Sequence, residues 1–152
     1  MVPVAFKLAD FGISQDLSIV TSQQLMTSNI VYNRGTLSYL APEQGVKGAK
    51  LHDVYRVEVF QLGVILFRLL FKQSPFRPSS FEDPMAKDPQ FLDKFIESDM
   101  NTHKVRISQP LKDLLRGMLH SENAKRLTLN QVLDSPWFNS MRTALVNDSQ
   151  LL

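Results

Sequence analysis

The stretch VEVFQLGVILFRLLF, residues 57–71, constrains the fold of this chain more than any other feature. Its apolar side chains fall on nearly every face of a helix, and a helix that is hydrophobic all round lies in the centre of a domain. Each large side chain there stabilises the fold by about 1.5–3 kcal/mol when fully buried. The helix therefore requires packing partners on all sides, and 152 residues are enough for one domain with a single core.

Further helices are predicted after this stretch. Ser108 is expected to be the N-cap of a helix with Pro110 in its first turn. The apolar stripe of that helix consists of Leu111, Leu114, Leu115 and Met118. Thr128 and Gln131 have capping-box spacing and open a short helix that runs to about residue 133. Another helix is expected over residues 90–97.

The first part of the chain is less regular. Residues 4–8 alternate weakly and predict one short strand that ends in a turn. Residues 14–34 are polar and without a period, which is typical of a long loop that is either functional or disordered. Pro42 suits the first turn of a short helix. The predicted fold class is therefore mainly α, with a short N-terminal strand, a long loop and about five helices.

Composition excludes several classes of function. Lys and Arg number 17 and Asp and Glu 15, and a net charge of +2 does not select nucleic acid or a membrane surface. The chain has no cysteine, which excludes disulfides, thiolate metal sites and a cysteine nucleophile. The longest apolar run is broken by Arg68, too early for a membrane span. His52, His103 and His120 share no metal-ligand spacing. The default location is intracellular and cytoplasmic.

Four motifs follow one another along the chain. Asp10-Phe11-Gly12 alone is a weak signal, but Gly35-Thr-Leu-Ser-Tyr-Leu-Ala-Pro-Glu43 ends 33 positions after Asp10 (43 − 10 = 33). The order Asp-Phe-Gly then Ala-Pro-Glu is that of a protein kinase, with a phosphorylation site between the two. EVFQLGVILFRLL and PLKDLLRGMLHSENAKRLTLNQVLDSPWF then resemble two helical motifs of the same family.

In this order the motifs resemble the C-terminal lobe of a eukaryotic Ser/Thr protein kinase, closest to the calcium/calmodulin-dependent group. The resemblance covers nearly the whole chain and begins just before the Asp-Phe-Gly motif. It implies one partial kinase domain over residues 1–152. Residues 1–13 would hold the strand and turn, 14–43 the activation segment, 44–140 the helical lobe, and 141–152 a tail.

The resemblance also implies roles for particular residues. Asp10 would coordinate the Mg²⁺ that bridges the ATP phosphates. Phe11 would pack inward and set active or inactive geometry, and Gly12 would allow the turn. Gly35 and Thr36 would form the shelf for the substrate residue after the phosphoacceptor.

Other residues would anchor or regulate the activation segment. Glu43 and Arg126 match a buried ion pair that ties the end of this segment to the late helices. Thr27 and Ser28 are the leading candidates for activating phosphorylation. The full set of candidates in this loop is Ser22, Thr27, Ser28 and Tyr32.

The sequence departs from the family pattern in two ways. Five positions before Gly63 the chain has Glu58, where the family has Asp. Asp53 is expected to lie in an exposed connection. The glycine-rich loop, the strand lysine with its helix glutamate, and the His-Arg-Asp loop are all missing from this chain. Because kinase catalysis consists almost entirely of positioning and charge stabilisation, the chain alone is expected to be inactive. Asp10 is then favoured as a structural residue, and neither Mg²⁺ nor ATP is expected to bind tightly.

Two hypotheses of different class remain. The chain is either a segment of an ATP-dependent Ser/Thr kinase acting on protein substrates, or an orphan kinase-derived lobe that serves as a non-catalytic subunit. In both cases a protein partner or the missing kinase half is expected to cover one side of the helix 57–71, and the isolated chain is not expected to be a well-behaved monomer.

Overall fold

A computed structural model of the chain describes residues 7–21, 27, 29, 31, 32, 34–76, 94, 97 and 106–140. Its α-helices are α2 (Tyr55–Phe71), α5 (Gln109–Met118) and α6 (Leu129–Leu133). Its 3₁₀ turns are η1 (Leu17–Ile19), η3 (Leu37–Tyr39) and η4 (Pro42–Gly45). Residues 136–140 are also helical. The predicted mainly helical class is confirmed, and extended pairing in the described part is limited to one isolated bridge between Thr27 and Lys50.

Some expected elements fall largely outside the described residues. Of the predicted strand over residues 4–8, only Lys7 and Leu8 are described, and both lie outside any strand. Of the helix expected over residues 90–97, only Lys94 and Glu97 are described, and both are helical. The 141–152 tail is not among the described residues.

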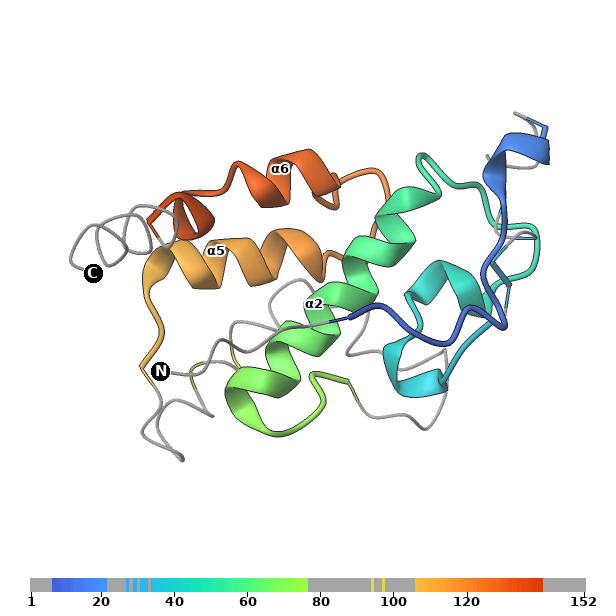
Figure 1. Ribbon diagram of the computed structural model, residues 1–152. Helices are drawn as coiled ribbons and strands as arrows, with labels where there is room; N and C mark the ends of the chain where they lie inside the picture. The colour runs from blue at the N-terminus through green and yellow to red at the C-terminus, as the bar shows by residue number, and fades with distance from the viewer. Residues whose placement is uncertain are drawn as a thin grey trace.

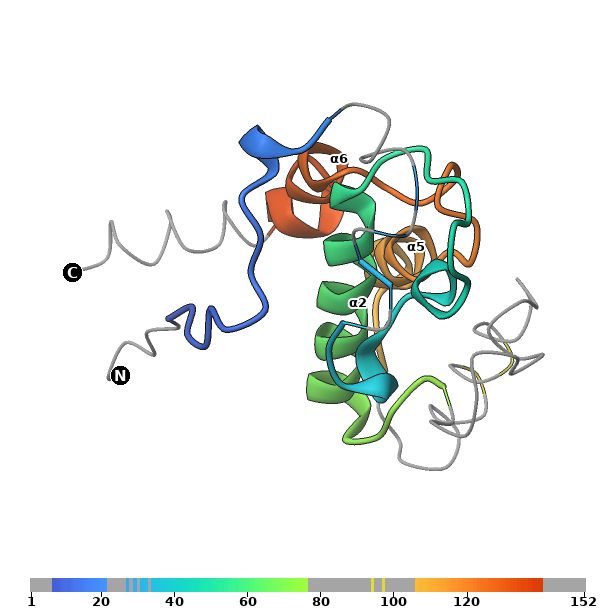
Figure 2. The ribbon, with the colours of Figure 1, turned by 90° about the vertical axis from the view of Figure 1, so that its right-hand side faces the viewer.

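Helix α2 is the central element of the described part. Figure 1 shows it crossing the molecule diagonally, with α5 and α6 on one side and the turns of residues 35–45 on the other. Turned by 90°, α5 lies directly beside α2 (Figure 2). The two helices approach closely at Gly63, where an added Cβ would lie 3.0 Å from the Cβ of Met118. The core between them contains Phe60, Val64 and Leu115.

One side of α2 is open among the described residues, which confirms the prediction that this helix needs a partner to cover it. Val57, Phe60, Val64, Phe67 and Phe71 are buried. On the other side, no described element covers the side chains of Tyr55, Leu62, Ile65 and Leu69, which are 60%, 44%, 44% and 58% exposed. Leu62, Ile65 and Leu69 are spaced three and four positions apart, and Tyr55 lies two turns before Leu62. The four side chains therefore lie on one side of the helix, hereafter the α2 apolar face.

The ends of the helices follow local sequence signals. The Thr128–Gln131 capping box is present, since the Thr128 amide donates to Gln131 Oε1 at 2.9 Å and the Gln131 amide to Thr128 Oγ1 at 3.2 Å. Ser108 is at the N-cap position of α5, but its hydroxyl makes no cap hydrogen bond. Helix α2 begins at Tyr55, two residues before the predicted start, with Val54 at its N-cap position. Asp53 Oδ1 accepts a hydrogen bond from the Tyr55 amide at 2.9 Å.

Within the residues that the structure describes, we find no helix of the length and hydropathy needed to span a bilayer.

Candidate functional site

The Asp10-Phe11-Gly12 turn is open to solvent. Asp10 has a φ of 60°, in the left-handed region that few non-glycine residues occupy. Its Oδ1 lies 3.4 Å from the Gly12 amide, and the Ser14 hydroxyl donates to the carbonyl of Phe11 at 2.6 Å. Phe11, expected to pack inward, is instead 67% exposed, because no described element lies over its ring.

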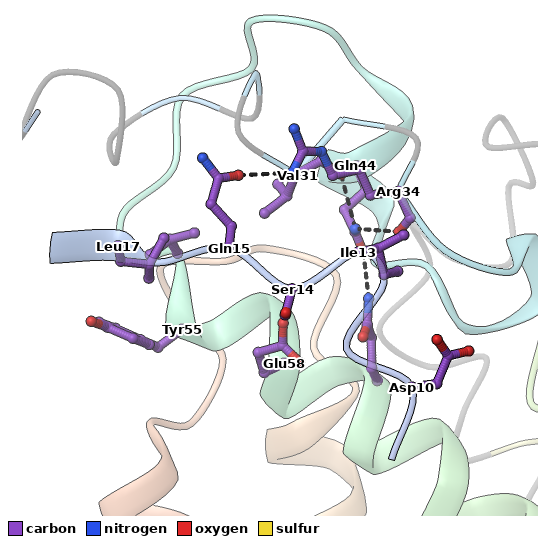
Figure 3. A pocket seen from close by; sticks show the side chains of 12 residues that line it. Asp10, Ile13, Ser14, Gln15, Leu17, Val31, Arg34, Gln44, Tyr55 and Glu58 are labelled. Carbon is purple, nitrogen blue, oxygen red and sulfur yellow. Dashed lines mark hydrogen bonds between the residues drawn. The ribbon is translucent and has the colours of Figure 1, made fainter. Parts of the chain in front are cut away.

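A cavity of about 270 Å³ separates this turn from the first half of α2. Figure 3 shows Asp10 and Glu58 on its two sides, with Ser14 above Glu58. The Arg34 guanidinium donates to Gln15 Oε1 at 2.8 Å along its upper wall. The cavity is therefore lined by two carboxylates and one bound guanidinium, among other side chains.

The Asp10-Phe11-Gly12 turn supplies one ligand for a metal–phosphate site and does not form a complete site. Mg²⁺ at nucleotide sites is held by one or two carboxylates together with the substrate phosphates. Asp10 supplies one exposed carboxylate. Among the described residues, no group of three or more His, Cys, Asp or Glu side chains could hold a metal ion.

The stretch expected to receive substrate is fixed against α2. Gly35 has a φ of 112°, and a Cβ there would lie 3.2 Å from Leu40 Cδ2. Thr36 is the N-cap of η3, and its carbonyl accepts from the Tyr39 amide at 2.9 Å. The guanidinium of Arg68 in α2 lies over the Tyr39 ring, 5.0 Å from its centroid.

Gln44 is a site residue that the sequence did not indicate. Its side chain is buried, and its Oε1 accepts from the Ala41 amide and from Gln61 Nε2, both at 3.0 Å. Its Nε2 donates to the carbonyls of Val31 at 3.0 Å and Arg34 at 3.3 Å. This one amide therefore ties the loop before Gly35 to α2. Its position directly after Ala-Pro-Glu is the only sequence signal that could have drawn attention to it.

Glu43 and Arg126 form a buried, bidentate ion pair across 83 positions of sequence. Arg126 Nη1 lies 2.6 Å from Glu43 Oε1, and Nη2 lies 2.9 Å from Oε2. Arg126 also donates to the carbonyls of His120 at 2.9 Å and Arg56 at 2.8 Å, and its guanidinium lies 4.8 Å from the centre of the Phe60 ring. Hydrogen bonds to several backbone carbonyls compensate for the desolvation of this charge.

Asn123 is a second residue that the sequence did not indicate. Its Oδ1 accepts from the amides of His52 at 3.0 Å and Asp53 at 2.9 Å. Its Nδ2 donates to Glu43 Oε1 and to the Asp53 carbonyl, both at 3.0 Å. No sequence pattern links residues 70–80 positions apart, so this contact is visible only in three dimensions.

The two carboxylates that depart from the family pattern have different surroundings. Glu58 is exposed and lines the cavity. Asp53, expected to be exposed, is partly buried; its Oδ1 accepts from the Tyr55 amide and its Oδ2 lies 3.7 Å from Arg56 Nε. The expectation for Asp53 was therefore wrong.

The candidates for phosphorylation are only partly described. Thr27 is half-buried and pairs with Lys50. Tyr32 is 40% exposed. Ser22 and Ser28 lie outside the described residues.

Comparisons with known proteins point to one family. The sequence profile of the protein kinase domain family matches residues 2–138. The Arabidopsis thaliana serine/threonine-protein kinase SRK2G is 34% identical over 137 residues, covering 87% of this chain and 34% of that protein. Mouse (Mus musculus) serine/threonine-protein kinase ULK3 is 30% identical over 131 residues, covering 86% and 25%. The human SNF-related serine/threonine-protein kinase is 30% identical over 135 residues, covering 89% and 15%.

The chain spans about a third or less of the length of these relatives. Their names support the predicted kinase family, whereas the likeness to the calcium/calmodulin-dependent group is only approximate. Proteins of this kind use ATP and Mg²⁺ in general.

Proposed function

This chain belongs to the protein kinase domain family, and from that membership we propose that it is the C-terminal lobe segment of an ATP-dependent Ser/Thr protein kinase. The observation that carries the proposal is the bidentate Glu43–Arg126 pair. The pair joins the Ala-Pro-Glu motif to the late helices. The motifs occur along the chain in the same order as in a kinase. Residues 1–152 are then one partial domain, with residues 14–43 as its activation segment.

Within such a kinase the residues of this chain have distinct tasks. Asp10 holds one Mg²⁺ ion, which neutralises charge on the ATP phosphates during transfer. Gly35 and Thr36 support the protein substrate next to its phosphoacceptor. Thr27 or Ser28 is the site at which phosphorylation orders the segment. The chain alone is catalytically incomplete, because the groups that cradle phosphate and activate the substrate hydroxyl are not among its residues.

A chimera tests this proposal directly. Residues 2–138 would replace the matching segment of the Arabidopsis SRK2G kinase, and phosphate transfer to a protein substrate would be measured. We expect activity that Asp10→Asn reduces by at least about 100-fold, since one metal ligand is lost. Asp113→Asn is the matched control, because this exposed carboxylate contacts only Gln109 and Arg116 on α5. A chimera that folds cooperatively but transfers no phosphate would argue against the proposal.

Nucleotide binding tests the incompleteness of the chain alone. Isothermal titration of the isolated chain with Mg-ATP is expected to show no measurable heat of binding. Binding that Asp10→Asn removes and Asp113→Asn preserves would show that the chain holds a nucleotide site by itself. Fractionation of cells that express the tagged chain would test the intracellular, cytoplasmic location that belongs to the same proposal.

The α2 apolar face favours a second candidate, a non-catalytic lobe that docks into a larger assembly. Apolar stripes of this kind mark sites of association. If the chain is a kinase segment, the other half of the kinase domain covers the α2 apolar face. If it is a non-catalytic lobe, a separate protein covers this face. An active chimera favours the first function. A folded but inactive chimera, together with a stable complex formed by the chain itself, favours the second.

A further inference from the structure

The Asn123 side chain uses its whole hydrogen-bonding capacity inside the fold. A primary amide has two donors and an oxygen with two lone pairs. All four are engaged at 2.9–3.0 Å, and the residue is 8% exposed. Buried amides with every position satisfied fix a local geometry, since any displacement leaves at least one polar group unpaired.

The partners of Asn123 come from separate parts of the chain. Glu43 ends the Ala-Pro-Glu motif in η4, His52 and Asp53 form the loop before α2, and Asn123 itself lies between α5 and α6. The Oε1 atom of Glu43 therefore accepts from both Arg126 and Asn123. Arg126 supplies the charge at this point, whereas Asn123 links the carboxylate to the backbone of the loop at residues 52–53.

We propose that Asn123 is a positioning residue that holds residues 35–53 in register with α2 through Glu43. The ion pair holds this stretch at Glu43, in its interior. Asn123 holds its C-terminal end, because three of its four bonds go to the backbone of His52 and Asp53. The consequence for substrate binding at Gly35 and Thr36 rests on the proposed kinase function, but the positioning itself does not.

Replacement of Asn123 by Asp preserves the shape of the side chain and changes its hydrogen bonds. An ionised Asp retains the two acceptor contacts with the amides of His52 and Asp53. It loses both donor contacts and places a second carboxylate beside that of Glu43. The charged and titratable groups around the position are Glu43 from η4, His52 and Asp53 from the loop before α2, Arg56 from α2, and Glu122 and Arg126 from its own loop.

Amide hydrogen exchange of the intact chain tests the proposal. At pH 7, Asn123→Asp is expected to raise the opening of residues 35–53 by about tenfold, because buried partners lose their donors. Opening of the α2–α5 core is expected to change much less. The effect should shrink as the pH falls towards about 5, since a protonated Asp regains one donor and the repulsion with Glu43 disappears. Asn123→Ala should open the same residues without recovery at low pH.

A double variant distinguishes positioning from general stabilisation. Glu43→Gln with Asn123→Asp exchanges donor and acceptor across the contact and keeps one carboxylate beside Arg126. Its opening of residues 35–53 is expected to be smaller than the product of the two single effects. Asn130→Asp, on the exposed surface of α6, is the matched control and should leave exchange unchanged.

Three outcomes would overturn the proposal: unchanged exchange in Asn123→Asp, equal opening of residues 35–53 and the α2–α5 core, or multiplicative effects in the double variant. Should Asn123→Asp unfold the chain, Asn123→Ser still tests local against global opening. No nucleotide or substrate is present in these experiments, so their failure would leave the kinase proposal standing.

Discussion

Arg126 is buried to 1% exposure and gains its stability from one carboxylate, several carbonyls and the Phe60 ring. Removal of one partner from a buried pair leaves an uncompensated charge, which costs on the order of 3–5 kcal/mol. We therefore expect Arg126→Met to lower the free energy of unfolding by about this amount in urea titrations. Glu43→Gln combined with Arg126→Met should cost less than the sum of the single changes.

The neighbouring Lys125 provides the control for Arg126. It pairs with Glu122 at 2.7 Å, but both side chains are largely exposed. Exposed pairs of this kind contribute little because solvent screens them, so Lys125→Met should leave unfolding nearly unchanged. A loss of less than about 1 kcal/mol in Arg126→Met would show that the pair does not anchor the segment.

His120 gives the chain a predictable dependence on pH. Burial lowers the pKa of its imidazole below the ordinary value of 6.5, and the charges of Lys125 and Arg126 act in the same direction, against the Glu122 carboxylate. The unfolded chain then binds a proton at a higher pH than the folded chain does. Stability is therefore full above about pH 7.5 and falls as the pH drops through 6.5 and below it.

Thermal unfolding between about pH 5.5 and pH 8 measures this contribution. His120→Gln should flatten the slope of the transition temperature against pH in this range. An unaltered slope in that variant would assign the pH dependence to other groups.

Among the elements, the α2–α5 contact depends on the absence of a side chain at Gly63. A Cβ there would lie 3.0 Å from Met118 Cβ and 3.0 Å from Leu119 Cδ2. Alanine is a better helix former by about 1 kcal/mol, but overpacking of a core costs about 1–3 kcal/mol. Because Met118 Cβ is fixed to the α5 backbone, we expect the second effect to prevail and Gly63→Ala to destabilise the fold by about 1 kcal/mol.

Glu58→Ala on the exposed side of the same helix is the control, because Glu and Ala have similar helix propensities. It changes a side chain of α2 without touching α5, and it should shift stability by no more than about 0.5 kcal/mol. A higher melting temperature in Gly63→Ala than in the parent chain would show that α5 moves away at little cost.

For the whole molecule, the α2 apolar face decides how the isolated chain behaves in solution. Leu62, Ile65 and Leu69 together expose a stripe that water solvates poorly. We expect the isolated chain to self-associate in sedimentation experiments and to bind a hydrophobic dye. Conversion of all three residues to Gln should shift it towards the monomer and reduce dye binding.

Leu129→Gln is the matched control for this face, because Leu129 is 49% exposed but belongs to α6. It should change neither association nor dye binding. A compact monomer of the parent chain without dye-accessible apolar surface would contradict the expectation.

Much of the site was predictable because its residues belong to ordered motifs. Glu43 and Arg126 each lie in a stretch with a recognisable pattern, so the sequence could name both. Gln44 and Asn123 carry comparable hydrogen-bond networks, yet nothing in the local pattern marks them. Their roles depend on partners that only the folded chain brings together.

The mainly helical class, the buried stripe of α5, the Thr128 capping box and the kinase family could all be predicted from the amino-acid sequence. Periodicity and capping act over one or two helical turns, so the chain encodes them locally. The folded chain was needed to show which residues form the open face of α2, that Phe11 is exposed to solvent and that Asn123 joins two loops to Glu43. Burial and long-range hydrogen bonds depend on which distant segments meet, and no local pattern specifies that.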